Sequence, residues 1–157
     1  MQTVLVVGAG GILAPAAAAL VAGGADVTGI GRSRTMPEGV HALYVDATDA
    51  AALRTALADR RFDEALVYGR TVTDASLQVL RETVAGRVAF VRTSAGADPA
   101  HGDLDVPDDM LQLGWHEEPD GSTRWHTPAE VSELALAVLG DGRPRILGTV
   151  RPWSARP

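Results

Sequence analysis

The sequence contains neither cysteine nor lysine, and aromatic residues make up only 4% of its 157 residues. The absence of cysteine excludes a disulfide framework and a cysteine-ligated zinc site, and it fits the reducing cytoplasm, where we expect the protein. The absence of lysine means that all 14 basic residues are arginine. Reactions that depend on a side-chain amine are therefore excluded.

Long apolar runs are also missing, since no stretch reaches the roughly 18 residues that suggest a membrane-spanning helix. The first residues, Met1-Gln2-Thr3, lack the basic region that opens a signal peptide. The net charge of −6 argues against binding to nucleic acid or to an anionic membrane. The four histidines lack the spacing of metal ligands. We predict no metal, no nucleic acid and no membrane partner.

The most informative pattern lies near the start of the chain. An apolar run, Thr3–Val7, is followed by a glycine cluster and an alanine-rich segment with helical character. The spacing is Gly8-x-x-Gly11-x-x-Ala14, in which Ala14 is small enough for close helix–strand packing, and Pro15 suits a first helical turn. We predict a phosphate-binding turn for the pyrophosphate of a dinucleotide. The alternative is a glycine-rich turn that binds nothing.

Strand-like and helix-like segments alternate up to residue 93. Short runs rich in Val, Leu and Ile predict strands at Thr3–Val7, Asp26–Ile30, His41–Val45, Glu64–Tyr68 and Arg87–Thr93. Helices are predicted between them at Ile12–Ala22, Asp49–Asp59 and Thr73–Ala85. This alternation predicts an α/β fold with a Rossmann-like, doubly wound, mostly parallel sheet and helices on both faces. No linker or repeat divides residues 1–157, so we expect a single domain.

The pattern changes after the fifth predicted strand. Ser94–Asp109 is dense in Gly, Pro and Asp, and irregular segments of this length are unusual unless they are functional or disordered. Met110–His116 and Thr123–His126 flank the turn signal Pro119-Asp120-Gly121-Ser122, which predicts a β-hairpin.

A complete helix start follows the predicted hairpin. Thr127 is expected to cap, Pro128 to occupy the first position and Glu130 to close the capping box. We expect this helix to end at Gly140. A last strand is predicted at Arg145–Val150 and a tail at Arg151–Pro157.

Residues that follow the second and third predicted strands bear on the cofactor. NAD-preferring domains place an acidic residue at the end of the second strand, whereas this chain has Arg32-Ser33-Arg34. Guanidinium groups bind phosphate oxygens bidentately, so this segment favours the 2′-phosphate of NADP(H) over a solvated basic loop. Asp46 is either an acceptor for the adenine amino group or a turn or capping residue. The predicted cofactor-binding residues are Gly8, Gly10, Gly11, Ile12, Arg32, Ser33, Arg34, Asp46, Ala47 and Gly69.

These residues resemble the short-chain dehydrogenase/reductase superfamily, and more closely its small, divergent bacterial members. Val6–Ala14 looks like the first turn of that group, Gly31-Arg32 is similar to its NADP-type strand end, and Asp46 matches its adenine-contacting aspartate. The resemblance implies that Ser94 takes the position of the catalytic serine. It is clear up to residue 93 and weak beyond it.

The chain departs from the family at the catalytic Tyr-x-x-x-Lys. The corresponding stretch, Val106–Leu111, has no tyrosine, and there is no lysine in the chain, so the usual acid cannot operate. Tyr68 lies at a strand end where the site is expected, although an aromatic side chain there is more often a wall. Histidine titrates near neutrality, and His116 and His126 flank the predicted hairpin. The candidate catalytic residues are Ser94, Tyr68 and His116.

We therefore predict an NADPH-dependent oxidoreductase that reduces a C=O or C=N bond of a small molecule with a non-standard proton donor. One alternative is a dinucleotide-binding protein without redox turnover, such as a sensor or an interaction module. Another is a non-redox enzyme, an isomerase, cyclase or lyase, that uses the same pocket. The expected partner is a small-molecule substrate, and we expect a homodimer or homotetramer.

Overall fold

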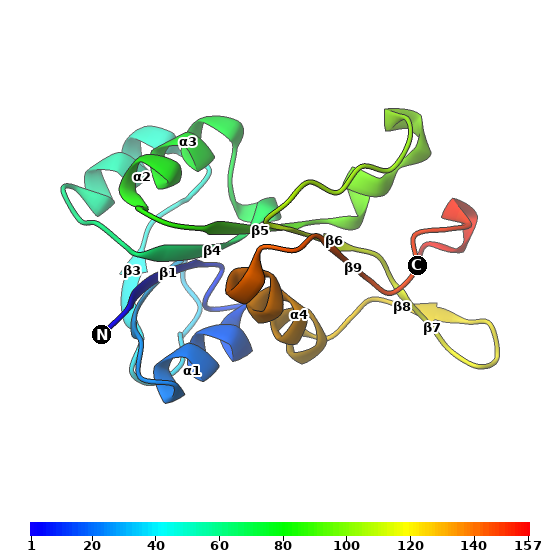
Figure 1. Ribbon diagram of the computed structural model, residues 1–157, viewed down its shortest axis with the longest axis horizontal. Helices are drawn as coiled ribbons and strands as arrows, with labels where there is room; N and C mark the ends of the chain where they lie inside the picture. The colour runs from blue at the N-terminus through cyan, green and yellow to red at the C-terminus, as the bar shows by residue number, and fades with distance from the viewer.

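A parallel sheet forms the centre of the computed structural model, which describes residues 1–157 (Figure 1). Its strands are β1 Thr3–Val7, β2 Asp26–Gly31, β3 His41–Tyr44, β4 Glu64–Tyr68, β5 Val88–Arg92, β6 Met110–Leu113 and β9 Arg145–Leu147. They lie in the order β3-β2-β1-β4-β5-β6-β9, and every neighbouring pair is parallel. Successive strands are added on one side of β1 as far as β3 and on the other side from β4 onward, so the order of addition reverses between β1 and β4. Doubly wound sheets bind ligands at this switch point, outside the carboxyl ends of the strands. The predicted fold class is confirmed.

Helices cover both faces of the sheet (Figure 1). Helices α1 (Ala14–Ala22) and α4 (Pro128–Asp141) lie on one face, and α2 (Ala50–Leu57) and α3 (Asp74–Thr83) lie on the other. Side chains of β1 alternate between the two layers, because successive residues of a strand point to opposite faces. Val4 and Val6 join the core beneath α1 and α4, whereas Leu5 and Val7 join the core beneath α2 and α3. Burial on both faces explains the continuous apolar runs of the strands.

The start of α4 is confirmed as predicted, but its end is not. The Thr127 hydroxyl accepts from the Glu130 amide, the Glu130 carboxylate accepts from the Thr127 amide, and Pro128 lies in the first turn. The helix continues past Gly140 to Asp141. Gly142, with φ of 72°, supplies the left-handed C-cap, and its amide donates to the Val138 carbonyl.

The predicted hairpin is wrong in its first half. Only His116–Glu117 (β7) and Thr123–Arg124 (β8) pair as a hairpin, while Met110–Leu113 is the buried strand β6. The two elements are separated at Gly114, where a Cβ atom would lie only 2.1 Å from the Thr149 carbonyl oxygen. A run that reads as one strand is therefore split because a distant segment packs against its backbone.

The segment between β5 and β6 contains two short 3-10 turns, Ser94–Ala97 and Pro99–His101. The guanidinium of Arg92 holds this segment by donating to the Asp105 carbonyl at 2.6 Å and to the Gln112 side chain. The fully buried Gln112 in turn donates to the Thr93 carbonyl at 2.9 Å. These bonds fix the backbone on which Ser94 stands. No helix of the structure has both the length and the apolar character needed to span a membrane.

Candidate active site

Two cavities lie along the carboxyl edge of the sheet, and Arg70, which follows β4, lines both. The smaller cavity, of about 220 Å³, lies over the ends of β1, β2 and β3 and includes Gly8, Arg32 and Asp46 in its wall. The larger cavity, of about 510 Å³, lies over the ends of β4, β5 and β6 and includes Ser94. The fold thus brings most of the predicted site residues to one edge, but into two compartments.

The glycine turn connects β1 to α1. Gly8 has φ of +104°, a conformation that glycine adopts without strain, and its amide donates to the Ile30 carbonyl at 2.9 Å. A Cβ atom at Gly8 would also lie 3.1 Å from the Tyr68 Cβ. Gly8 is therefore required by the backbone and by the close approach of β4.

The next two glycines lie beneath Arg34. A Cβ atom at Gly10 would lie 3.0 Å from the Arg34 Cβ and carbonyl oxygen, whereas one at Gly11 would come no closer than 3.7 Å, to the Arg34 Nη1. The amides of Gly10 and Ile12 donate no hydrogen bond to the chain, and Ile12 also lines the larger cavity. Free amides at a helix N-terminus, with a guanidinium across from them, form a cradle suited to a phosphate group.

Arg32 and Asp46 lie together in the smaller cavity. The Arg32 side chain is 79% exposed, and its Nη2 lies 3.8 Å from the Asp46 Oδ2. Asp46 Oδ1 accepts from the Thr48 hydroxyl at 2.7 Å and from the Thr48 amide at 3.0 Å. These bonds, with the Thr48 hydroxyl first, lower the pKa of Asp46, so the group is a carboxylate. Asp46 therefore stabilises the turn after β3 through one oxygen, while its other oxygen faces Arg32; a contact with adenine stays a prediction.

Three further predicted cofactor residues differ in their placement. Ala47 is buried in the wall of the smaller cavity. Ser33 is exposed and lines neither cavity. Gly69 also lines neither, and a Cβ atom there would lie 2.5 Å from the Phe90 ring and 2.9 Å from the Val91 carbonyl oxygen. Packing against β5, rather than approach of a ligand, explains the glycine at this position.

Ser94 stands in the larger cavity with a partner that sequence reasoning missed. Its buried hydroxyl oxygen accepts from the Nε of Arg156 at 3.2 Å. The Arg156 guanidinium lies 5.2 Å from the ring centroids of both Trp125 and Trp153, so two indoles hold it by cation–π contacts. Arg156 was predicted to lie in a tail, and no spacing or motif links it to a serine 62 positions earlier.

The segment from Thr149 onward is fixed against the cavity at several points. Trp115, fully buried, meets Trp153 edge to face at 5.9 Å. The Arg151 guanidinium donates to the Ala97 carbonyl at 2.8 Å, and the Thr123 hydroxyl donates to the Ala155 carbonyl at 2.7 Å. This segment therefore packs as part of the site wall.

The hairpin places one histidine in the larger cavity and leaves the other outside. The His126 side chain lines the cavity, is only 4% exposed and has no hydrogen-bond partner on either ring nitrogen. Burial lowers the pKa of His126, so its ring is neutral at neutral pH. His116, the predicted candidate, is not part of the cavity wall and lies 3.6 Å from Glu118. Tyr68, the remaining candidate, does line the cavity.

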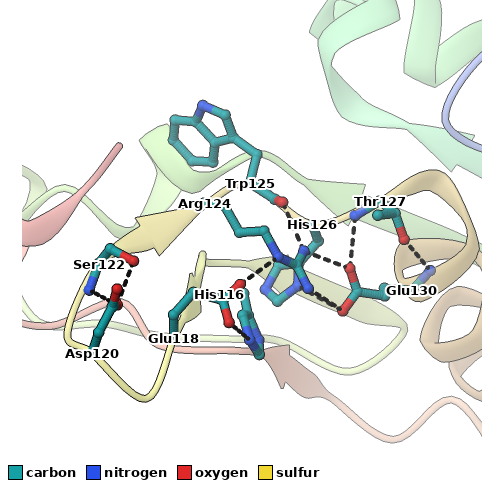
Figure 2. Close-up of polar contacts among 9 residues, drawn as sticks. All are labelled: His116, Glu118, Asp120, Ser122, Arg124, Trp125, His126, Thr127 and Glu130. Carbon is teal, nitrogen blue, oxygen red and sulfur yellow. Dashed lines mark hydrogen bonds and ion pairs between the residues drawn. The ribbon is translucent and has the colours of Figure 1, made fainter.

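An ion-pair cluster fixes the junction between the hairpin and α4, as Figure 2 shows. The Arg124 guanidinium donates to Glu118 at 3.1 Å and to Glu130 at 2.8 Å. The hydrogen bond from Arg124, followed by that from the Thr127 amide, lowers the pKa of Glu130 to about 2. The Trp125 ring points away from this cluster in Figure 2, which leaves it free to contact Arg156. The cluster thus orients the two neighbouring residues that line the cavity.

Known structures share this fold. A candidate betaketoacyl-ACP reductase has a TM-score of 0.67 at 16% identity, over 94% of this chain and 96% of that chain. BdcA in complex with NADPH has a TM-score of 0.61 at 13% identity, over 95% and 93%. An oxidoreductase of the short-chain dehydrogenase/reductase family from Burkholderia thailandensis has a TM-score of 0.56 at 18% identity, over 94% and 91%.

These likenesses confirm the expected resemblance at the level of the fold. The chain has the Rossmann-like fold of short-chain oxidoreductases, over nearly its whole length. No protein-family model matches the sequence, and no curated protein matches it significantly. Its function must therefore be inferred from the site.

Proposed function

We propose that the protein is an NADPH-dependent oxidoreductase that reduces a C=O or C=N bond of a small molecule. The observation that carries this proposal is the pair of cavities that share Arg70 at the switch point of the sheet. An elongated dinucleotide that spans both would place its adenosine end by Arg32 and Asp46 and its reactive end by Ser94. The structural likeness to BdcA in complex with NADPH supports this assignment.

The residues of this chain fit NADPH at the smaller cavity and at the glycine turn beside it. Arg32 is exposed beside the end of β2, where its guanidinium can bind a 2′-phosphate, and the free amides of Gly10 and Ile12 suit the pyrophosphate. When bound, NADPH supplies a hydride to the substrate. Ser94 then orients the substrate oxygen or nitrogen, because its hydroxyl proton is still free while its oxygen accepts from Arg156.

The proton comes from the wall of the larger cavity in this proposal. His126 is our first candidate, since it is buried there with both ring nitrogens unpaired, and Tyr68 is the second. With protonated His126 as the acid, kcat/KM has an alkaline limb: it falls as the pH rises above the pKa of His126, which burial lowers from its ordinary value. His126→Asn would remove the limb, whereas Tyr68→Phe would leave it in place.

The direct test is to measure binding and consumption of NADPH. Isothermal titration calorimetry should show binding of NADPH that is lost in Gly11→Val. Absorbance at the reduced nicotinamide band should then fall in the presence of compounds from a panel of small carbonyls and imines. Absence of NADPH binding to the wild-type protein would contradict the proposal.

A second function, dinucleotide binding without turnover, is favoured by one observation. The stretch in which the superfamily carries its Tyr-x-x-x-Lys has neither residue, and the larger cavity replaces them with Arg156 and His126. Tight NADPH binding with no consumption across the whole panel would support this function over reduction. A cytoplasmic location and a homo-oligomeric state remain proposals, and size-exclusion chromatography of the same preparations tests the second.

A further inference from the structure

Arg156 has more hydrogen-bond donors than the protein uses. A guanidinium carries five N–H donors, and the single bond recorded for Arg156 runs from Nε to Ser94. No carboxylate lies within ion-pair distance of it, whereas Arg32, Arg124 and Arg145 all have acidic partners. The Arg156 Cζ lies 5.2 Å from the ring centroids of Trp125 and Trp153, and neither Nη1 nor Nη2 donates a hydrogen bond within the chain.

The charge of the larger cavity contrasts with that of the chain. The protein carries a net charge of −6, yet the larger cavity contains Arg70, Arg156 and no acidic residue. Arg70 also lines the smaller cavity, so a dinucleotide that spans both accounts for it. Arg156 lines only the larger one, where a separate anion can pair with it. A carboxylate is an anion that a free guanidinium N–H binds through a charge-assisted hydrogen bond.

The pairing of Arg156 with Ser94 defines how far that carboxylate lies from the reducible group. The nearer Nη group of a guanidinium carries an N–H bond parallel to Nε–H. Because Nε is 3.2 Å from the Ser94 oxygen, an acceptor on that Nη N–H lies beside the serine hydroxyl, and neighbouring atoms of one ligand can contact both. We propose that the larger cavity binds 2-oxo carboxylates, with the carboxylate on Arg156 and the adjacent carbonyl oxygen on Ser94. The contacts of Arg156 with Trp125 and Trp153 preorganise the site at little entropic cost.

The proposed binding site is argued only from the geometry of Arg156 and Ser94, whereas the reaction rests on the proposed function. In that reaction the carbonyl carbon accepts a hydride from NADPH, a C–H bond forms, and the C=O π bond breaks. The oxygen takes up one proton and becomes a hydroxyl, so that a 2-oxo acid, NADPH and a proton give a 2-hydroxy acid and NADP⁺.

Tryptophan fluorescence gives a local readout, because Trp125 and Trp153 contact Arg156 directly. The probes are 2-oxohexanoate, 2-hexanone, which replaces the carboxylate by a methyl group, and 5-oxohexanoate, which moves the carbonyl away from it. We expect 2-oxohexanoate to bind at least tenfold more tightly than either comparison compound. Equal binding of 2-oxohexanoate and 2-hexanone by the wild-type protein would overturn the proposal without recourse to any variant. Tight binding of 5-oxohexanoate would overturn the assignment of the carbonyl to Ser94.

Variants then assign the effect to the guanidinium. Arg156→Gln should weaken 2-oxohexanoate binding at least tenfold, and Arg156→Lys should fall between, because an ammonium keeps the charge but loses the fork. Arg81→Gln, an exposed arginine on α3, is the matched control and should bind as the wild type does. Unchanged binding in Arg156→Gln would show that Arg156 serves only to pack the segment. NADPH titrations of the same samples separate the two proposals. If the protein binds NADPH but does not prefer 2-oxohexanoate to 2-hexanone, only the 2-oxo carboxylate proposal is contradicted.

Discussion

The two cavities are built in different ways. The smaller one is formed by residues at or just after the ends of β1, β2, β3 and β4, so each of its functional groups lies within a few residues of a strand end. The larger one combines strand ends with the hairpin, α4 and the segment that carries Arg156. The first is a property of the doubly wound fold itself. The second depends on long-range packing, and packing of this kind can vary while the fold stays the same.

The largest expected effect is on dinucleotide binding at the glycine turn, in which Gly8 lines the smaller cavity and Ile12 the larger. Gly11→Val should lower NADPH affinity at least 100-fold, because a branched side chain would fill the space in front of the free amides of the turn. The variant should fold, since Gly11 does not adopt a positive φ. Isothermal titration calorimetry gives the affinity and circular dichroism the fold.

Gly140→Val is the matched control, because nothing lies within 4 Å of a Cβ atom built at that helical position. It should bind NADPH as the wild type does. Unchanged affinity in a natively folded Gly11→Val would mean that the glycine turn is not the pyrophosphate site. In contrast, binding of 2-oxohexanoate measured without cofactor should survive in Gly11→Val, which would separate the two cavities.

The next effect concerns the choice between NADPH and NADH. Arg32→Ala should weaken NADPH binding by about 1.5–3 kcal/mol, roughly one to two decades in Kd, through loss of a charge-assisted phosphate contact. NADH affinity should hardly change, because NADH lacks the 2′-phosphate. Titration of both cofactors against wild type, Arg32→Ala and the exposed control Arg81→Ala tests this. Equal affinity of the wild type for the two cofactors would contradict the assignment of Arg32.

The same difference explains what the sequence could predict. The glycine turn, Arg32 and Asp46 follow from local patterns, because parallel strands bring their carboxyl ends to one edge whatever the rest of the chain does. Gly10 and Gly69 show the limit of such patterns. Gly10 is required because Arg34 lies close to it, and Gly69 because Phe90 does; no local motif identifies either partner.

The larger cavity lay mostly beyond sequence reasoning for a related reason. Ser94 was found because it ends a strand, but Arg156 reaches it from 62 positions away. His116 was chosen over His126, but the sequence pattern does not say which of the two the cavity reaches. The hairpin was placed too early because the run from Met110 looks continuous, and only the backbone of Thr149 against Gly114 divides it.

A smaller effect is expected at Ser94, within the larger cavity. Ser94→Ala removes a hydroxyl that would hold the substrate and should lower kcat/KM by about 0.5–1.5 kcal/mol, roughly 2- to 13-fold. NADPH affinity should stay the same, because Ser94 does not line the smaller cavity. Steady-state kinetics with the best carbonyl substrate of the panel measures the first and calorimetry the second. Full activity in Ser94→Ala would mean that the serine only shapes the turn after β5.

The smallest expected effect is on the free energy of unfolding. It tests whether the Arg124–Glu130 pair holds the hairpin that contributes to the wall of the larger cavity. The pKa of Glu130 is about 2 in the folded protein and 4.5 in its ordinary range, so the folded state binds the proton more weakly than the unfolded state does. Glu130 therefore stabilises the protein fully above about pH 5, and this contribution falls away as the pH drops from about 4.5 towards 2. Its side chain is 34% exposed, so solvent screening keeps the contribution modest, about 1 kcal/mol including the capping box.

Urea unfolding should show Glu130→Gln less stable than wild type by about that amount at pH 6 and by much less at pH 3. Glu133→Gln, an exposed glutamate on the same helix, should show no such difference, and an equal loss for Glu130→Gln at both pH values would contradict the role of the Arg124–Glu130 pair. Tryptophan emission should also shift in Glu130→Gln while NADPH affinity does not, because the pair positions Trp125 but touches nothing in the smaller cavity.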